Sequence, residues 1–308
     1  MSALKLYTRF YGALHFDRIP YWVLSPLRRL VRVLANKHLP LVLSRAVTGS
    51  SNHRSNLIVS FTSFPARIDD VWKVVECIKR QSILPRKIIL WLSKDQFPSK
   101  DNVPDKLIQC QDDLFEIRYV DGDIRSHKKY YYTILEYPDC DFITCDDDVF
   151  YDPDMIKRLL DTSSKFPGCI VANHTSHIQI TDSGELLPYR TWGDNEPAYA
   201  KNDRIQIGVG GVYYPAHSLH PLVTNKDLFM ELAPLADDIW LNCMARLNHI
   251  EIVQSPEVLL PLSIESNAPT LSSVNIGAEH KNDVQIAKIR EYLKSCGMED
   301  VYYKSQTL

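Results

Sequence analysis

The chain lacks the sequence signals of a zinc-binding, redox-active or membrane-spanning protein. Its seven cysteines are scattered and include no Cys-x-x-Cys pair, so we expect reduced packing residues in a cytosolic compartment. No uncharged apolar run is long enough to span a bilayer. The first residues also lack the basic, apolar and small-residue order of a secretory signal. We therefore expect a cytoplasmic protein that does not cross the membrane.

The chain also lacks a charge excess that would attract a polyanion. It has 35 basic and 38 acidic residues among 308, a formal net charge of -3, and we expect no nucleic-acid partner. Hydrophobic residues make up 45% and charged residues 24%, which excludes a disordered or fibrous protein. This composition favours one large α/β domain with an ordinary core.

Residues 1–50 differ from the rest in having eight basic residues against one acid, Asp17. Between the charges, apolar and aromatic residues recur at nearly helical spacing from Tyr21 to Leu34. A basic amphipathic helix suits an anionic membrane surface, where each basic residue adds about 1 kcal/mol. We predict peripheral docking on the cytoplasmic face of a bacterial inner membrane. The alternative is a helix packed on the main domain.

Beyond a polar linker that ends near residue 55, apolar strands alternate with helical patterns. The expected strands are Leu57–Phe61, Lys87–Leu92, Phe115–Val120 and Asp141–Cys145. This order predicts an α/β fold with a mostly parallel, Rossmann-like central sheet flanked by helices, which binds ligands at the carboxyl ends of its strands. The expected divisions are segment 1–55 and domain 56–308, with a donor half at about 56–150, an acceptor half at about 151–280 and a C-terminal helix at about 281–296.

Three carboxylates, Asp146, Asp147 and Asp148, directly follow the fourth strand. Closely packed carboxylates repel one another and are typical of a cation site, and Asp146 and Asp148 point to the same side of an extended chain. Oxygen ligands suit Mg²⁺ or Mn²⁺, with diphosphate oxygens completing the shell. The alternative is a solvated acidic turn.

From about residue 56 to 289 the chain resembles the GT-A glycosyltransferases, in particular a bacterial polysaccharide branch similar to glycosyltransferase family 2. Four motifs carry the resemblance in family order: the acidic cluster, the glycine-rich loop Gly208–Gly211, the pair Asp237 and Asp238, and the late His280. The resemblance implies that Asp146 and Asp147 lie near the nucleotide, and that Asp148 binds the metal with Asp146 and His280. It also places Gly210 and Gly211 beside donor and acceptor.

The activity that the resemblance implies is metal-dependent transfer of a sugar from a nucleotide-diphosphate sugar, with a UDP-sugar as the expected donor. The acceptor would be a glycan or a polyprenyl-linked oligosaccharide in capsule or O-antigen synthesis. An inverting reaction would use Asp238 as base, with Asp237 the next candidate. Where many family members have Glu-Asp this chain has Asp-Asp. Either residue could instead cap the helix that follows.

Loops after the first and third strands offer further candidates for the nucleotide site. Phe64, Pro65 and Arg67 follow the first strand, where the resemblance places the nucleoside, and Arg67 could meet the diphosphate or pair with nearby acids. After the third strand come acids for the base or ribose and cations for the phosphates: Asp121, Asp123, Arg125, Lys128 and Lys129. The alternative for this second group is a solvated charged loop.

An aromatic and acidic stretch between residues 174 and 206 contains Trp192 and Asp194, which suit sugar binding. Trp192 could equally pin a loop to the body of the protein.

Three other classes deserve comparison. Aspartate-nucleophile phosphatases need their acidic motif on the first strand, with Thr or Val where this chain has Phe150. A sugar nucleotidyltransferase shares the metal and nucleotide requirements, but usually has a basic glycine-rich signature near its start, which residues 62–67 lack. A non-catalytic carbohydrate-binding protein would not need both acidic groups. The nucleotidyltransferase and the binding protein remain the alternatives.

Overall fold

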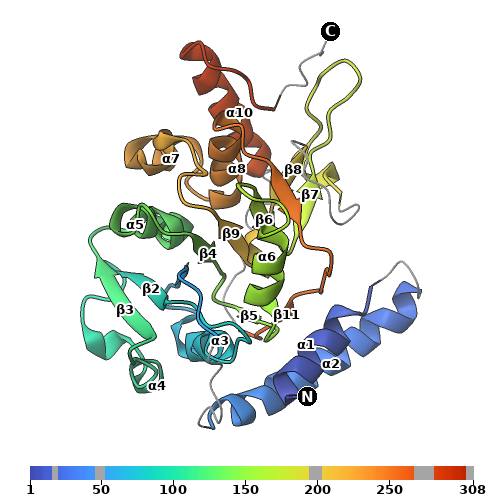
Figure 1. Ribbon diagram of the computed structural model, residues 1–308, viewed down its shortest axis with the longest axis vertical. Coiled ribbons are helices and arrows are strands. Elements are labelled where there is room, and N and C mark those ends of the chain that lie inside the picture. Colours follow the sequence, from blue (N-terminus) through green and yellow to red (C-terminus); the bar gives the residue numbers. More distant parts are fainter. Residues whose placement is uncertain (16–19, 46–52, 194–202, 267–280, 303–308) are drawn as a thin grey trace.

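The protein folds around a seven-stranded, mostly parallel sheet (Figure 1). The computed structural model describes residues 1–15, 20–45, 53–193, 203–266 and 281–302. The strands, in spatial order, are β10 (Ile252–Gln254), β6 (Ile170–Ala172), β9 (Val212–Tyr214), β4 (Phe142–Thr144), β1 (Ile58–Thr62), β2 (Lys87–Ser93) and β3 (Phe115–Val120). Only β9 is antiparallel to its neighbours in this sheet. The α/β fold expected from the sequence is therefore confirmed.

Helices cover both faces of this sheet (Figure 1). The described α-helices are α1 (Ala3–Gly12), α2 (Tyr21–Leu43), α3 (Val71–Ile78), α4 (Asp105–Ile108), α5 (Lys128–Glu136), α6 (Met155–Ser163), α7 (Lys226–Leu232), α8 (Asp237–Leu247) and α10 (Lys281–Ser295). Two short antiparallel pairs join β5 (Val149–Phe150) to β11 (Leu262–Ser263) and β7 (Thr175–His177) to β8 (Arg204–Gln206). Short 3₁₀ segments are η1 (Ile68–Asp70), η2 (Lys100–Asn102), η3 (Arg125–His127), η4 (Tyr189–Thr191), η5 (Gly208–Gly210) and η6 (Pro221–Thr224).

Strand β1 is buried on both sides of the sheet. Alternate residues of a strand point to opposite faces, so β1 contributes to two cores. Val59 and Phe61 join the core beneath α3 and α6, whereas Ile58 joins the core beneath α5, α7 and α8. Burial on both faces explains why β1 and β2 read as nearly continuous apolar runs in the sequence. The bounds predicted for all four strands lie within one residue of the observed ends of β1, β2, β3 and β4.

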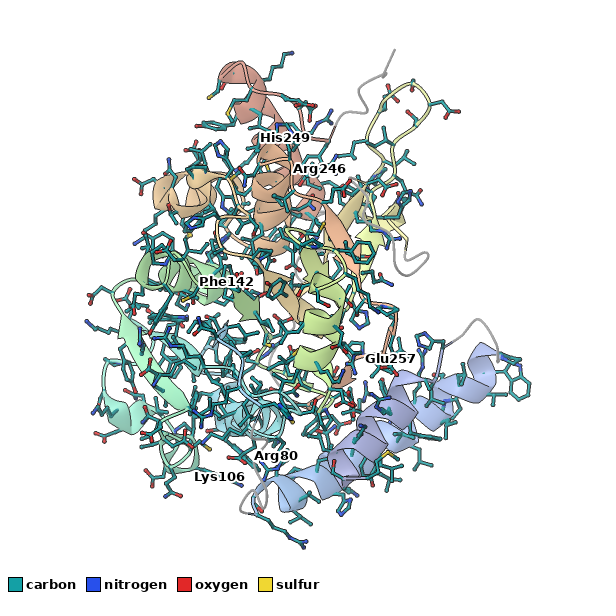
Figure 2. All side chains as sticks on the ribbon, viewed as in Figure 1. Arg80, Lys106, Phe142, Arg246, His249 and Glu257 are labelled. Atoms are coloured by element: carbon teal, nitrogen blue, oxygen red, sulfur yellow. The ribbon has the colours of Figure 1, made fainter. Side chains whose placement is uncertain are left out.

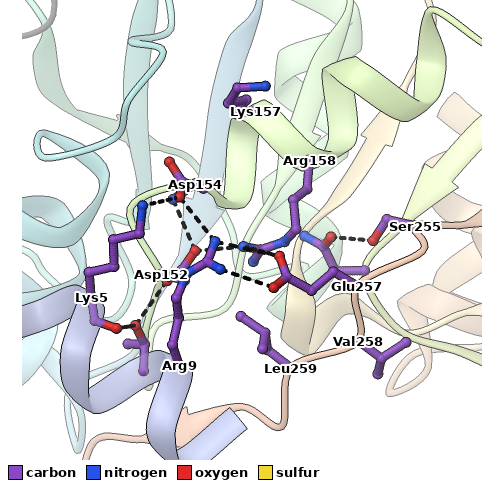
Figure 3. A network of polar contacts seen from close by, with 12 residues as sticks. Lys5, Arg9, Asp152, Asp154, Lys157, Arg158, Ser255, Glu257, Val258 and Leu259 are labelled. Atoms are coloured by element: carbon purple, nitrogen blue, oxygen red, sulfur yellow. Dashed lines mark hydrogen bonds and ion pairs between the residues drawn. The ribbon is translucent and has the colours of Figure 1, made fainter. Parts of the chain in front are cut away.

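The basic entry segment forms two helices that pack against each other and against the main domain. They run antiparallel, since Tyr7 of α1 contacts His38 of α2 while Leu14 accepts a hydrogen bond from Arg28. Lys5 and Arg9 of α1 form ion pairs with Asp154 (Figure 3). Among the described residues, none of the helices combines the length and apolarity needed to cross a bilayer.

Candidate active site

Sheet topology brings three separate loops to one edge. β1 and β4 are parallel neighbours, so the loops that follow them leave the sheet side by side. β9 is antiparallel to β4 and pairs Val212 with Thr144, so the loop before β9 lies at the same edge. The acidic cluster, the loop through Arg67 and the glycine-rich loop therefore meet there. This is the edge at which open α/β sheets bind ligands.

Asp147 is held by the loop after β1. Its two carboxylate oxygens accept hydrogen bonds from Ser63 Oγ at 2.5 Å and from Arg67 Nη1 at 2.7 Å. The same guanidinium nitrogen lies 2.8 Å from Asp148 Oδ2. Burial raises the pKa of Asp147 above its ordinary value, although Arg67 and Ser63 oppose the shift. With both oxygens engaged and only 6% of the residue exposed, Asp147 braces the cluster rather than facing a ligand.

Asp146 and Asp148 are the members of the cluster that face outward, with 31% and 25% of their side chains exposed. Burial and the neighbouring Asp146 carboxylate raise the pKa of Asp148 to about 6. A divalent cation would relieve this repulsion. No group of three His, Cys, Asp or Glu side chains arranged to hold a metal occurs within the described ranges. Two carboxylates still fit Mg²⁺, which often binds one or two carboxylates together with substrate phosphates and water.

Lys129, at the start of α5, links the acidic cluster to α8. Its Nζ lies 3.1 Å from Asp146 Oδ1 and 2.8 Å from Asp237 Oδ2, and only 6% of the side chain is exposed. Burial acts to lower the pKa of this ammonium group. Attraction to Asp146, Asp237 and Asp238 outweighs burial and holds the pKa well above its ordinary value. Lys129 is therefore a permanently charged cation at the centre of the site.

Asp237 and Asp238 occupy the first turn of α8, where the helix dipole favours carboxylates. The helix is capped at Ala236, so the predicted capping alternative is wrong. Asp238 Oδ2 instead accepts a hydrogen bond from the backbone N–H of Gly208 at 3.0 Å. Burial would raise the pKa of Asp237, but Lys129 and His127 hold it below its ordinary value. Burial and the Asp237 charge raise the pKa of Asp238 to about 7.

Asp238 should make the metal-free protein less stable as pH rises from about 4 to about 7. The pKa of Asp238 is about 7 in the folded state, against an ordinary value of 3.8. Between these pH values the folded state binds more protons than the unfolded state, so the free energy of unfolding falls as pH rises. Asp238→Asn keeps an acceptor for Gly208 without the charge. Near pH 8 we expect its Tm to exceed that of the unmodified protein by at least about 2 °C. The Tm difference should vanish near pH 4. Thermal melts in EDTA measure it, and an equal Tm difference at about pH 4 and about pH 8 would contradict the assignment.

The glycine-rich loop places Gly208, rather than the predicted Gly210 and Gly211, against the charged groups. A Cβ on Gly208 would lie 3.2 Å from both Asp238 Oδ1 and Lys129 Nζ. A Cβ on Gly210 would lie 2.3 Å from His174 Cδ2, and Gly211 has φ +87° and packs against Met155. Gly210 and Gly211 are thus glycines for reasons of packing and backbone conformation.

Gly210→Ala should lower the free energy of unfolding by about 1–3 kcal/mol, because the new methyl group overlaps the His174 ring. Gly208→Ala is the matched comparison and should cost less, because its nearest atoms belong to side-chain ends. Urea unfolding of the two variants would measure both values. Equal losses would contradict the packing account of Gly210.

Most of the charged loop after β3 does not reach the cluster. Lys128 pairs with Asp123, which also accepts hydrogen bonds from Gln96 and from the backbone N–H of Arg125. Asp121 is highly exposed and pairs with Lys94. Of the five residues predicted from this loop, only Lys129 joins the acidic cluster.

The remaining predicted residues have mixed placements. Phe64 lies beside the Arg67 guanidinium, whose central carbon is 5.4 Å from the ring centroid, and Pro65 is exposed next to it. Trp192 is 7% exposed and its Nε1 donates to Leu187 O at 2.9 Å, which favours the packing alternative over a sugar platform. Asp194 and His280 lie outside the described residues.

Sequence reasoning missed several residues that shape the site. Ser63 donates to Asp147, and the backbone N–H of Gly208 donates to Asp238. Tyr151 accepts a hydrogen bond from the Asp146 backbone N–H at 2.8 Å, and Gln206 donates to the Asp238 carbonyl at 3.1 Å. Ser63 could have been found, because it directly follows β1. Nothing in the sequence pattern marks Tyr151 or Gln206, because their partners are distant or main-chain atoms.

Neither a family model nor a curated protein sequence matches this chain. Solved structures with a similar fold include a 4-diphosphocytidyl-2C-methyl-D-erythritol synthase, with 10% identity, a TM-score of 0.41 and coverage of 72% of this chain and 98% of that chain. An apo UDP-glucose pyrophosphorylase has 10% identity and a TM-score of 0.38, covering 79% and 99%. The 4-diphosphocytidyl-2C-methyl-D-erythritol synthase of Anaerococcus prevotii has 15% identity and a TM-score of 0.36, covering 79% and 96%.

These comparisons contradict the expectation of a polysaccharide glycosyltransferase. The similar structures are nucleotidyltransferases, which matches the alternative that the sequence left open. At such low identity the likeness concerns the fold alone. The glycan or polyprenyl-linked acceptor and the use of Asp238 as base were predicted for glycosyl transfer, and neither the structure nor the comparisons test them.

Proposed function

We propose that this protein is a divalent-metal-dependent nucleotidyltransferase that joins a nucleoside monophosphate unit to a sugar 1-phosphate. The observation that carries the proposal is the buried Lys129 ammonium, held between Asp146 and Asp237 directly beside the carboxylates that fit a cation. Arg67 pairs with the other two carboxylates of the cluster, Asp147 and Asp148. A site that combines cations with metal-binding carboxylates suits phosphate groups.

The reaction would form one P–O bond and break another. An oxygen of the sugar phosphate attacks the α-phosphorus of a nucleoside triphosphate, and the bond to the bridging oxygen breaks to release pyrophosphate. A divalent ion on Asp146 and Asp148 would supply charge neutralisation and orientation for the phosphates. Lys129 and Arg67 would stabilise the negative charge that grows on the phosphoryl oxygens.

The acidic pair on α8 fits this chemistry better than a reaction that needs a base. A phosphate oxygen is already ionised and needs no proton removed before it attacks. Asp237 is committed to Lys129, and Asp238 accepts a hydrogen bond from Gly208. We therefore assign the pair to orienting Lys129 and the glycine-rich loop.

The direct test incubates the full chain with nucleoside triphosphates and sugar 1-phosphates in combination, with Mg²⁺ or Mn²⁺, and measures pyrophosphate release. The reverse reaction, incorporation of labelled pyrophosphate into a triphosphate from a nucleotide sugar, uses the same proteins. One productive triphosphate and sugar pair that depends on metal would support the proposal. Release of a nucleoside diphosphate from a nucleotide sugar, without pyrophosphate chemistry, would overturn it.

A further inference from the structure

The α1/α2 hairpin exposes an unusual amount of apolar surface. Ten large apolar side chains are exposed among the described residues, and only Leu135 and Val284 lie outside the N-terminal segment. The eight within it are Met1, Leu6, Phe10, Trp22, Val23, Leu30, Leu34 and Leu41. Scattered exposed apolar residues are normal, but a concentration in one structural unit marks an interaction surface.

On α2 the exposed apolar residues form one face rather than a random scatter. At roughly 100° per residue, Trp22, Val23, Leu30, Leu34 and Leu41 fall within about one third of the helix circumference. The buried residues Leu24, Val31, Ala35, Leu39 and Leu43 lie on the opposite side, against α1 and the main domain. Helix α2 thus carries apolar side chains on two opposite sides.

Four basic side chains of the hairpin, Lys5, Arg9, Arg28 and Arg32, make contacts within the protein. Arg9 of α1 lies 3.0 Å from Asp154 and 3.0 Å from Glu257, and Lys5 lies 2.6 Å from Asp154 (Figure 3). On α2, Arg32 lies 3.4 Å from Glu265 and Arg28 donates to the carbonyl of Leu14 at 2.7 Å.

The anchoring contacts fix which side of the hairpin faces outward. Thr8 donates to Asp152 at 3.1 Å. Asp152 also pairs with Arg158 of α6 (Figure 3), so α1 is tied to the domain beneath it. Figure 2 shows the hairpin along one side of the molecule, with side chains projecting from it away from the main domain. Docking therefore needs no rearrangement to present the apolar face.

The charge around this face selects the partner. Arg29 and Lys37 are exposed on α2, and the sequences of α1 and α2 contain no acidic residue. We infer that the exposed apolar face of the α1/α2 hairpin inserts into the headgroup region of an anionic lipid bilayer. Leucine, phenylalanine and tryptophan side chains would enter the acyl boundary, while Arg29 and Lys37 would contact lipid phosphates. This inference is independent of the reaction proposed above.

Trp22 provides a local probe of insertion. It is 76% exposed, whereas the other four tryptophans of the chain, Trp72, Trp91, Trp192 and Trp240, are all buried. Vesicles of phosphatidylcholine with phosphatidylglycerol should shift the tryptophan emission of the full-length protein to shorter wavelength and protect it from acrylamide. Trp22→Phe should remove this response while leaving vesicle binding measurable by sedimentation.

Substitutions on the hairpin test the face directly. Leu30→Gln combined with Leu34→Gln should weaken co-sedimentation with anionic vesicles at least about tenfold. Arg29→Gln combined with Lys37→Gln should weaken it about tenfold and reduce the preference over pure phosphatidylcholine. The control is Leu135→Gln, another exposed leucine, on α5, which should leave binding unchanged.

Other outcomes would overturn the inference. One is absence of binding to either vesicle by the unmodified protein. Another is a concentration-dependent dimer in sedimentation velocity that the two leucine substitutions abolish without any effect on vesicles, since it would assign the face to a second copy. All altered side chains are exposed, so unchanged circular dichroism and Tm should accompany the substitutions.

Discussion

Lys129→Met is expected to lower nucleotidyl transfer by on the order of 10²–10³-fold, the usual cost of removing one preorganised group that stabilises transition-state charge. The reason is the position of its ammonium group between Asp146 and Asp237, where no other described cation replaces it. Methionine keeps much of the side-chain volume, so the loss should reflect charge rather than a cavity. Steady-state pyrophosphate release measures the effect.

The adjacent lysine supplies a matched control. Lys128 is equally buried and paired with a carboxylate, Asp123, but it points away from the acidic cluster. Lys128→Met should therefore lower stability while retaining most of the turnover of the folded enzyme. Equal loss of turnover in the two variants would contradict the assignment of Lys129.

Lys129→Met should also change the pH dependence of stability. Without the ammonium, the Asp146, Asp237 and Asp238 carboxylates repel one another, so the pKa values of Asp237 and Asp238 rise in the folded state. Stability should then be highest at low pH and fall as pH rises through those values. Urea midpoints at about pH 5 and about pH 8 should diverge further in the variant than in the unmodified protein.

Asp148→Asn is expected to abolish metal-dependent nucleotide binding and to lower turnover by on the order of 10³-fold. A bound metal contributes several kcal/mol of charge stabilisation, and about 1.4 kcal/mol corresponds to a factor of ten. Nucleotide affinity with and without Mn²⁺, measured by calorimetry, reports the binding. Asp148→Asn should bind nucleotide equally weakly in both conditions.

The comparison for Asp148→Asn is Asp139→Asn, near the opposite end of the same strand, where the carboxylate is 86% exposed. It should bind nucleotide as the unmodified protein does. Asp147→Asn should differ from both, because Asp147 is buried against Ser63 and Arg67 and its loss should appear first in Tm. Unchanged metal-dependent binding in Asp148→Asn would refute the site.

The sequence by itself determined the local structure and part of the site. Short apolar runs identified β1, β2 and β4, because strands buried on both faces carry little polar alternation. The acidic cluster after β4 was also visible in the sequence, because three consecutive carboxylates at the end of a buried strand have few structural explanations. The basic and apolar character of residues 1–50 also predicted the helix α2.

Only the tertiary structure decided which of the charged residues meet. Lys128 and Lys129 are adjacent in sequence and equivalent by composition, but α5 turns one toward Asp123 and the other toward Asp146. Gly208 was likewise indistinguishable from Gly210 until β9 placed it against Asp238. Arg9 and Arg32 of the hairpin pair with acids that lie far away in the chain, in the α6 region and near β11. Periodicity reports which side of an element is apolar, whereas the partners of a charged side chain are set by long-range packing.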